Sequence, residues 1–385
     1  MANSWIEVQK LGQSLWYDNM SRSLVSRKDN GPSELAGMME TLGVRGITSN
    51  PAIFEKSIAN GRDYDYDIEQ LGKSGLSTEE IYERLTTDDI RNAADILRSV
   101  YDATDGHDGF VSIEVDPTLS AKTEESIHAA QRIWRTIDRP NVMIKIPGTP
   151  EGIPAVRALL EEGINVNITL LFGLDNYSAV ANAYIDAIKA RMAKGKDVKH
   201  IASVASFFLS RVDTNVDAKL DKMIADSTEE GLILRLKALR GQAANANAKL
   251  AYERFGALFQ GDDFAECVVA GARVQRCLWA SVGTKNKAYS DVMYIEPLIG
   301  PDTVTTVPDE TLAAFLDHGT AANTLGTGLT AAHLVIDSLA GFGIDTEKVA
   351  EELQIDGVKK FEDAFRGLLA NLESKRATVE ATIEV

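Results

Sequence analysis

A lone lysine interrupts an apolar run near the middle of the chain. Lys145 lies in the segment VMIKIPGT (142–149), between isoleucines. Such a run predicts a buried strand, yet a lysine is almost never buried without a partner, because its charge is costly to remove from water unless its pKa falls. With a lowered pKa, part of the lysine is a free amine that attacks carbonyl groups and forms an imine. The residue therefore lies either at a sheet edge or in a buried site that uses this chemistry.

Making or breaking a carbon–carbon bond beside an imine requires an acid and a base, and two carboxylates are candidates for these roles. Asp18 and Glu114 stand at or near the ends of two predicted strands, 14–18 and 110–116. Barrel enzymes carry their active sites at the carboxyl ends of their strands, which favours a shared site. The alternative is a buried ion pair between Glu114 and Lys145 on adjacent strands, and the spacing alone leaves both interpretations open.

Short apolar segments alternate with amphipathic segments along the whole chain. In the amphipathic segment 77–101 apolar residues recur every three or four positions, and Ser77 and Glu80 have the spacing of a capping box, so it predicts a helix. The predicted strands are 14–18, 44–50, 110–116, 141–146, 165–172, 201–207, 277–282 and 302–308.

Eight strands that alternate with helices favour the α/β class and a closed parallel sheet, a single (β/α)8 TIM barrel. A doubly wound sheet fits less well, because no glycine-rich dinucleotide loop follows an early strand. We expect one domain over residues 1–385, in which 309–385 forms C-terminal helices that pack on the barrel.

Polar and apolar residues alternate within two of these strands. Asn167 and Thr169 share one face of 165–172, and Glu114 lies on the polar face of 110–116. The apolar faces must meet the surrounding helices, so the polar faces point into the barrel. Since Lys145 lies between these strands in the sequence, we expect it between Glu114 and Thr169 in space.

The composition narrows the possible partners and the compartment. The formal net charge of −17 argues against nucleic acid or an anionic membrane as partners but leaves room for a small anionic ligand. No signal peptide is visible, and no apolar run approaches the roughly 20 residues of a membrane span. Cys267 and Cys277 lack any metal-ligand pattern, which fits free thiols in a reducing, cytoplasmic compartment. The five histidines lack a paired metal-binding spacing, so we expect no metal site.

Several motifs of the chain resemble the transaldolase family, in its longer bacterial form. The motifs are GVRGITSNPAIF (43–54), SIEVDP (112–117), VMIKIPGT (142–149), GINVNITLLF (163–172), SFFLSRVD (206–213) and WASVGTKN (279–286). The resemblance covers nearly the whole chain. It implies the transaldolase reaction of the pentose phosphate pathway, which uses no cofactor and no metal. In that reaction a dihydroxyacetone unit moves from sedoheptulose 7-phosphate or fructose 6-phosphate to glyceraldehyde 3-phosphate or erythrose 4-phosphate.

The resemblance also implies roles for individual catalytic residues. Lys145 is similar to the lysine that forms the imine, a Schiff base with the substrate. Asp18 is similar to the acid/base that handles the proton of the C4 hydroxyl group. Glu114 and Thr169 look like the pair that holds a catalytic water.

The substrate-binding residues follow from the same motifs. Asn50 and Asn167, with Ser206 nearby, look like the hydrogen-bond partners of the dihydroxyacetone part. Arg211 looks like the main phosphate anchor; alternatively, it pairs locally with an aspartate such as Asp213 or Asp217. For the second phosphate contact, where shorter family members carry an arginine, this chain offers Ser281 and Lys285.

Two other functions remain open at this point. One is a fructose-6-phosphate aldolase that releases free dihydroxyacetone; such enzymes carry tyrosine where this chain has Phe208. The other is a non-catalytic sugar-phosphate-binding barrel that uses Lys145 as a salt bridge. The oligomeric state, monomer or homodimer, is also open.

Overall fold

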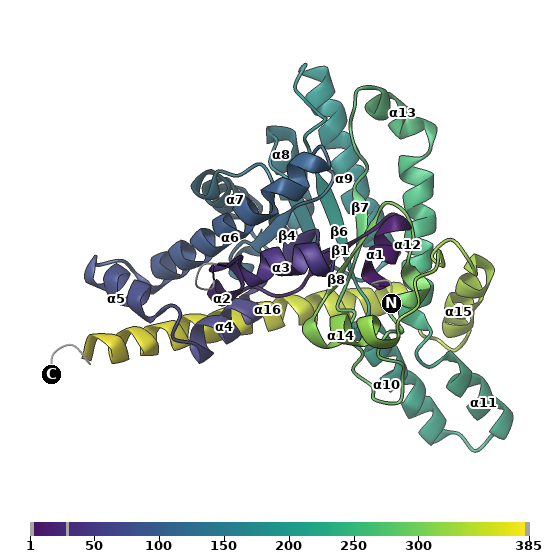
Figure 1. Ribbon diagram of the computed structural model, residues 1–385. Helices are drawn as coiled ribbons and strands as arrows, with labels where there is room; N and C mark the ends of the chain where they lie inside the picture. Colours follow the sequence, from purple (N-terminus) through teal and green to yellow (C-terminus); the bar gives the residue numbers. More distant parts are fainter. Residues whose placement is uncertain (1–3, 28–30, 382–385) are drawn as a thin grey trace.

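Eight parallel strands form a closed barrel in the computed structural model, which describes residues 4–27 and 31–381 (Figure 1). Each strand pairs with its neighbours in the sequence, and β8 closes the barrel by pairing with β1 from Gln13↔Thr303 to Tyr17↔Val307. The strands are β1 Gln13–Tyr17, β2 Gly46–Thr48, β3 Val111–Glu114, β4 Val142–Pro147, β5 Val166–Leu171, β6 Ser203–Phe208, β7 Arg276–Ala280 and β8 Thr303–Val307. All eight predicted strands and the TIM barrel are confirmed. The two ends of the predicted domain, residues 1–3 and 382–385, lie outside the described part of the chain.

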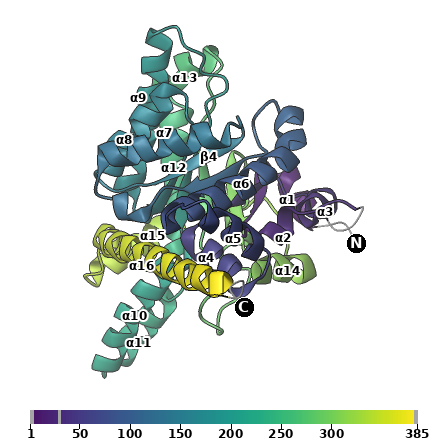
Figure 2. The same cartoon turned by 90° about the vertical axis from the view of Figure 1, so that its left-hand side faces the viewer.

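Helices surround the barrel on its outside (Figures 1 and 2). They are α1 Ser4–Lys10, α2 Arg22–Val25, α3 Glu34–Thr41, α4 Pro51–Asn60, α5 Asp65–Lys73, α6 Thr78–Ala103, α7 Thr123–Ile137, α8 Gly152–Glu162, α9 Leu174–Ala193, α10 Ser210–Asp226, α11 Glu230–Leu239, α12 Ala243–Phe259, α13 Asp262–Val269, α14 Asp309–His318, α15 Leu329–Gly341 and α16 Thr346–Ala381, with short 3-10 turns η1 Pro117–Leu119 and η2 Glu296–Leu298. The predicted capping box is confirmed at α6, where Ser77 and Glu80 bond each other's backbone N–H groups.

The register of the central strands places the polar residues side by side. Glu114 of β3 lies opposite Lys145 of β4, and Lys145 in turn lies opposite Asn167 of β5. Thr169 lies two residues further along β5, opposite Pro147. The predicted place of Lys145, between the strands of Glu114 and Thr169, is therefore confirmed.

The last helix of the chain lies across one end of the barrel. α16 has 36 residues and contacts α4, α6, α10, the turn η1 and the end of β5. In Figure 1 it is the long yellow helix that runs beside α4. Because α4, η1 and α10 all follow strand ends, this end is the carboxyl end of the sheet. One continuous hydrophobic core extends from Trp5 to Leu372, so α16 shares the core with the barrel.

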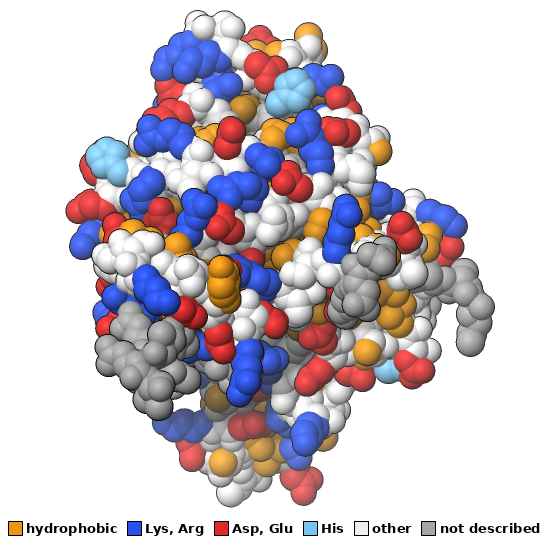
Figure 3. Space-filling model, turned by 60° about the vertical axis from the view of Figure 1, so that its left-hand side comes forward, with side chains coloured by type: hydrophobic (Ala, Val, Ile, Leu, Met, Phe, Trp, Pro, Cys, Tyr) orange, Lys and Arg blue, Asp and Glu red, His pale blue; other side chains and the backbone are white. Residues whose placement is uncertain are grey.

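The surface carries charges of both signs. On the face drawn in Figure 3, the basic and acidic side chains lie among one another. Within the described residues, no helix combines the length and hydrophobicity that a membrane span needs.

Gly46 in β2 has no room for a side chain, because a Cβ atom would lie 2.7 Å from ring atoms of Trp16. The Trp16 ring is fully buried and donates a hydrogen bond to Asp108 (2.8 Å), so it cannot move aside easily. We expect Gly46→Ala to lower the free energy of unfolding by about 1–3 kcal/mol through overpacking. Urea unfolding measures this change.

Gly37→Ala is the matched control, since a Cβ atom at Gly37 in α3 meets nothing within 4 Å. Alanine there removes the helix penalty of glycine, so stability stays the same or rises by up to about 1 kcal/mol. Equal stability of the two variants contradicts the packing constraint at Gly46.

Candidate active site

A cavity of about 120 Å³ opens at the carboxyl end of the barrel. Strands, strand ends and two helices contribute to it. It is lined by Asp18, Thr48, Asn50, Lys145, Thr169, Ser206, Phe208, Arg211, Ala280, Ser281, Thr306 and Phe361. Most of the residues predicted from the sequence therefore meet in one place.

Lys145 is buried, with 5% of its surface exposed, and it reaches the cavity. Its Nζ donates a hydrogen bond to the carbonyl oxygen of Ser49 (3.1 Å) and lies 3.5 Å from Oε2 of Glu114. The ion pair that the sequence offered as an alternative is thus present. It does not remove the lysine from the cavity, so the pair is compatible with an amine that reacts there.

Glu114 and Thr169 carry buried oxygens on the two strands that flank Lys145. Burial raises the pKa of Glu114, although the positive charge of Lys145 acts in the opposite direction. Oε2 of Glu114 and Oγ1 of Thr169 have no hydrogen-bond partner among the described residues. A buried polar atom of this kind is normally satisfied by protein or by ordered water. Thr169 lines the cavity, whereas Glu114 lines a separate hollow of about 110 Å³ together with Tyr82 and Phe365.

Asp18 follows the end of β1 and faces the cavity from another side. Its Oδ1 accepts a hydrogen bond from Oγ1 of Thr48 (2.8 Å), and Thr48 is itself hydrogen-bonded to Thr306. Burial raises the pKa of Asp18, while the Thr48 hydrogen bond and the charge of Lys145 oppose the rise. Asp18 does not cap the helix that follows, because the cap of α2 is Ser21.

Thr48 and Thr306 were missed by the sequence analysis. Both lie on strands that it had predicted, and strand alternation was the available signal. Both hydroxyl groups face the cavity, as Thr169 does. Alternation along β2 separates Thr48 from Ile47 and would have found Thr48, whereas β8 carries threonines on both faces, so alternation does not single out Thr306.

Asn50 and Asn167 take different positions. Asn50 caps α4, with its Oδ1 accepting from the backbone N–H of Ile53 (3.0 Å), and its amide nitrogen remains as a donor at the cavity. Asn167 is fully buried and does not line the cavity. It donates to Ser112 (3.0 Å) and accepts from Ser206 (2.6 Å). Its effect on the cavity therefore passes through the hydroxyl of Ser206.

Arg211 stands in the first turn of α10 and brings a cation to the cavity. Its Cζ lies 5.4 Å from the ring centroid of Phe208, within the range of a cation–π contact. Burial lowers the pKa of Arg211, and the charge of Asp356 opposes this. The buried Nη1 has no hydrogen-bond partner among the described residues, so it can receive an anionic ligand.

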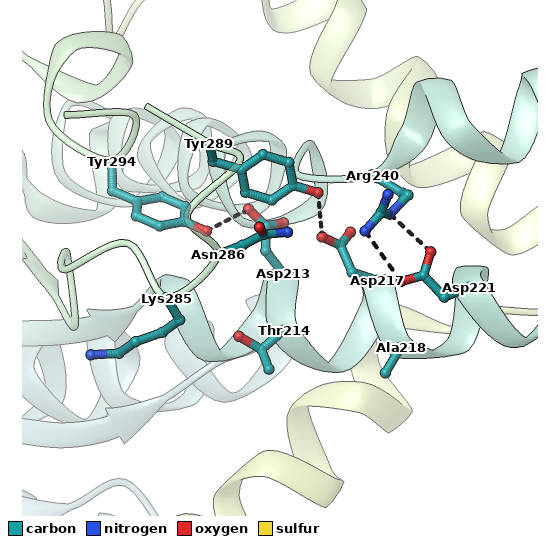
Figure 4. A pocket seen from close by; sticks show the side chains of 10 residues that line it. All are labelled: Asp213, Thr214, Asp217, Ala218, Asp221, Arg240, Lys285, Asn286, Tyr289 and Tyr294. Carbon is teal, nitrogen blue, oxygen red and sulfur yellow. Dashed lines mark hydrogen bonds and ion pairs between the residues drawn. The ribbon is translucent and has the colours of Figure 1, made fainter. Parts of the chain in front are cut away.

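The two aspartates offered as local partners of Arg211 are occupied elsewhere (Figure 4). Asp213 accepts a hydrogen bond from the hydroxyl of Tyr294 (2.9 Å), and Asp217 accepts one from the hydroxyl of Tyr289 (2.5 Å). Within the described chain, no ion pair joins Arg211 to either of them, so the pairing alternative is wrong. The tyrosines instead hold the segment after β7 against α10.

Ser281 and Lys285, the two candidates for the second phosphate contact, are separated by the fold. Ser281 lines the cavity in a left-handed backbone conformation (φ 55°), and its hydroxyl lies 3.0 Å from that of Ser210. Lys285 lines a neighbouring hollow of about 250 Å³ instead. In Figure 4 its side chain points away from the carboxylates of that hollow. The structure therefore brings Ser281, but not Lys285, to the cavity.

The two cysteines do not line this cavity. Cys267 and Cys277 are free and buried, as expected for two structural thiols. No cluster of three or more His, Cys, Asp or Glu side chains placed to hold a metal ion is found in 4–27 and 31–381.

A lysine amine beside carboxylates, at the carboxyl end of a (β/α)8 barrel, is the arrangement that an imine-forming enzyme of the aldolase type requires. Residues 15–372 match the family described as transaldolase/fructose-6-phosphate aldolase, and the chain belongs to this family.

Full-length relatives support the assignment. The chain is 48% identical over 376 residues to transaldolase 2 of Nostoc sp. strain PCC 7120, and the match covers 97% of each chain. It is 47% identical to transaldolase of Trichodesmium erythraeum, which covers 97% of this chain and 98% of the relative. For transaldolase of Mycolicibacterium smegmatis the identity is 43% over 93% of each chain.

Asp213 gives the structure a pH-dependent stability. Burial raises the pKa of Asp213 from 3.8 to about 6, although hydrogen bonds from the backbone N–H of Ala244 and from Tyr294 oppose the rise. Because the folded pKa exceeds the unfolded one, ionisation of Asp213 costs folding free energy as the pH rises through this interval. Asp213→Asn removes the titration but keeps an acceptor for Ala244. From pH 4 to pH 7 we expect the wild type to lose about 2–3 kcal/mol relative to this variant.

Urea unfolding of both proteins at the two pH values measures the difference. A difference that stays constant between pH 4 and pH 7 would show that Asp213 titrates as an exposed carboxyl group does.

Proposed function

We propose that this enzyme is a transaldolase that carries a dihydroxyacetone unit on Lys145 between a ketose phosphate and an aldose phosphate. The donors are sedoheptulose 7-phosphate or fructose 6-phosphate, and the acceptors are glyceraldehyde 3-phosphate or erythrose 4-phosphate. The observation that carries the proposal is the Lys145 amine in the cavity, 3.5 Å from Glu114 and facing the same space as Asp18. The full-length relatives named transaldolase support the choice of reaction.

Imine formation is the first step. Lys145 loses a proton and attacks the C2 carbonyl of the ketose, and the resulting carbinolamine loses water to give the imine. Glu114 is the group to take and return protons here, because its raised pKa makes it a stronger base than an exposed carboxylate. Thr169, with its unpartnered hydroxyl, helps Glu114 to hold the water that leaves and later returns.

Carbon–carbon cleavage follows at Asp18. The Asp18 carboxylate takes the proton of the C4 hydroxyl, the C3–C4 bond breaks, and its electron pair passes to the protonated imine. The products are an aldose phosphate, which leaves, and a three-carbon enamine on Lys145. The hydrogen bond from Thr48 holds the Asp18 carboxylate in place for this proton transfer (2.8 Å).

Transfer is the reverse of cleavage with a new aldehyde. The enamine attacks the acceptor carbonyl, and protonated Asp18 returns its proton to the new alkoxide. Hydrolysis of the imine then releases the product ketose. Asn50 and Ser206 bind the hydroxyl groups of the three-carbon unit, and Arg211 with Ser281 binds the phosphate at the other end.

Reductive trapping tests the imine directly. Incubation with fructose 6-phosphate and borohydride is expected to leave a reduced dihydroxyacetone unit on Lys145, found by peptide mass spectrometry. Lys145→Arg is expected to fold cooperatively and to lose turnover, because arginine stays protonated and forms no imine.

Asp18→Asn is the companion variant for the cleavage step. It is expected to form the imine but not to break the C3–C4 bond, so the trapped adduct keeps all six carbons. An adduct on another lysine, or turnover without any adduct, rules out the imine on Lys145. A three-carbon adduct at the wild-type level in Asp18→Asn rules out the role of Asp18.

Phe208 bears on whether the enamine is transferred or released. Its ring lines the cavity and offers no hydrogen bond to a water, so the enamine persists until an acceptor arrives. We expect Phe208→Tyr to raise the ratio of dihydroxyacetone release to transfer several-fold, because a phenol can orient water and share its proton. Coupled assays with and without erythrose 4-phosphate measure the ratio.

Phe207→Tyr is the control, because Phe207 packs against Tyr177 and Trp279 on the other face of β6. Its ratio of release to transfer should equal that of the wild type. Stoichiometric release by the wild type, unaffected by acceptor, would favour the aldolase that frees dihydroxyacetone.

A further inference from the structure

The C-terminal helix contributes a side chain to the cavity. Phe361 of α16 is buried, with 8% of its surface exposed, and it lines the cavity together with Phe208 and Arg211. From the sequence alone, this region is expected only to pack on the barrel. A residue from the last helix therefore stands beside the predicted phosphate anchor.

Two contacts fix α16 at the carboxyl end of the barrel. Gln354 donates from its amide nitrogen to the carbonyl oxygens of Gly148 (3.0 Å) and Leu170 (3.1 Å), which follow or end β4 and β5. At Gly357 an added Cβ atom would lie 2.9 Å from a methyl group of Leu170 and 3.7 Å from Nη1 of Arg211. The helix thus approaches both the strand end and the guanidinium without an intervening side chain.

The guanidinium of Arg211 lies between two aromatic rings. Its Cζ is 5.4 Å from the ring centroid of Phe208 and 6.0 Å from that of Phe361. Both distances fall within the range of cation–π attraction. Among the described residues Arg211 forms no ion pair, and its buried Nη1 lacks a hydrogen bond. The rings, rather than a carboxylate, hold the cation, so its N–H groups stay available to a ligand.

We infer that Phe361 is a positioning residue for the phosphate subsite, where it holds the Arg211 guanidinium against Phe208 in the orientation that receives the phosphate of the substrate. The inference rests on the proposed function, which supplies the phosphate. An arginine side chain loses much rotational freedom when it is ordered, and this loss weakens binding unless the side chain is ordered beforehand. Phe361 orders it before the substrate arrives. Its loss therefore affects binding of phosphorylated sugars and not the chemistry at Lys145.

Phe361→Leu is the test, because leucine keeps an apolar side chain but removes the ring. We expect the KM for erythrose 4-phosphate to rise roughly three- to thirtyfold, the range that corresponds to one cation–π contact. The KM for erythrose, which lacks the phosphate, and the kcat with either acceptor are expected to change less than about twofold. Phe361→Tyr restores a ring and is expected to restore the wild-type KM.

Phe365→Leu is the matched control on the same helix. Phe365 is buried one turn further along α16 and packs edge-on against Tyr82, with ring centroids 5.4 Å apart. The same substitution there removes a buried ring without touching Arg211. We expect it to leave the ratio of the two KM values unchanged, even where it lowers the stability of the fold.

A double-mutant cycle with Arg211→Ala shows whether Phe361 acts through the arginine. Once Arg211 is absent, Phe361→Leu is expected to cause no further rise in the KM for erythrose 4-phosphate. A further rise of the same size, or equal rises for erythrose and erythrose 4-phosphate, overturns the inference.

Calorimetric titration with inorganic phosphate separates this inference from the proposed function. Phe361→Leu is expected to weaken phosphate binding several-fold relative to wild type and to Phe365→Leu. If the wild type binds phosphate more tightly than Phe361→Leu but transfers no dihydroxyacetone, the proposed function is overturned and the role of Phe361 in the phosphate subsite is kept. Unchanged phosphate affinity in Phe361→Leu overturns the subsite role, whatever the activity.

Discussion

The burial of the Lys145 side chain is the constraint on which the rest of the site depends. A buried ammonium group is stable only where nearby groups replace the water that it has lost. Here the replacements are the carboxylate of Glu114 at 3.5 Å and the carbonyl oxygen of Ser49 at 3.1 Å. These two groups therefore fix the position of the Lys145 side chain, which reaches the cavity.

Burial of the carboxyl groups themselves sets the properties of Asp18 and Glu114. It raises the pKa of both Asp18 and Glu114, which makes each a better proton acceptor than an exposed side chain. Their surroundings differ in hydrogen bonding. Asp18 is held by Thr48, whereas Oε2 of Glu114 lacks a hydrogen bond among the described residues. Asp18 is therefore fixed by a hydroxyl group, whereas Glu114 is held by its ion pair with Lys145.

At the Arg211 end of the cavity, the structure holds a guanidinium group without an ion pair among the described residues. The opposite face of α10 is tied down by Tyr294 on Asp213 and Tyr289 on Asp217, which fixes the helix that carries Arg211. The guanidinium itself meets aromatic rings, which attract a cation but leave its N–H groups unoccupied. A carboxylate in the same place would compete with the phosphate of a substrate for those groups.

The sequence by itself determined the barrel and the relative positions of Lys145, Glu114 and Thr169 along its strands. Alternation along each strand indicates which side chains point inward, and parallel strands in chain order fix their neighbours, so Lys145 was correctly placed between Glu114 and Thr169. These relations are local or follow from strand order. They need no knowledge of how the outer helices pack.

Tertiary structure alone decided the periphery of the site. Phe361 reaches Arg211 only because α16 folds back over the carboxyl end of the barrel, a path that no periodicity in α16 reveals. Lys285 lines a different hollow because the segment that carries it leaves the strand and is bound to α10. Asn167 is hydrogen-bonded to Ser112 of β3 and Ser206 of β6, which lie on either side of its own strand β5. In each case the deciding contact joins segments that are distant in the sequence. Composition and residue spacing do not indicate which distant segments will meet.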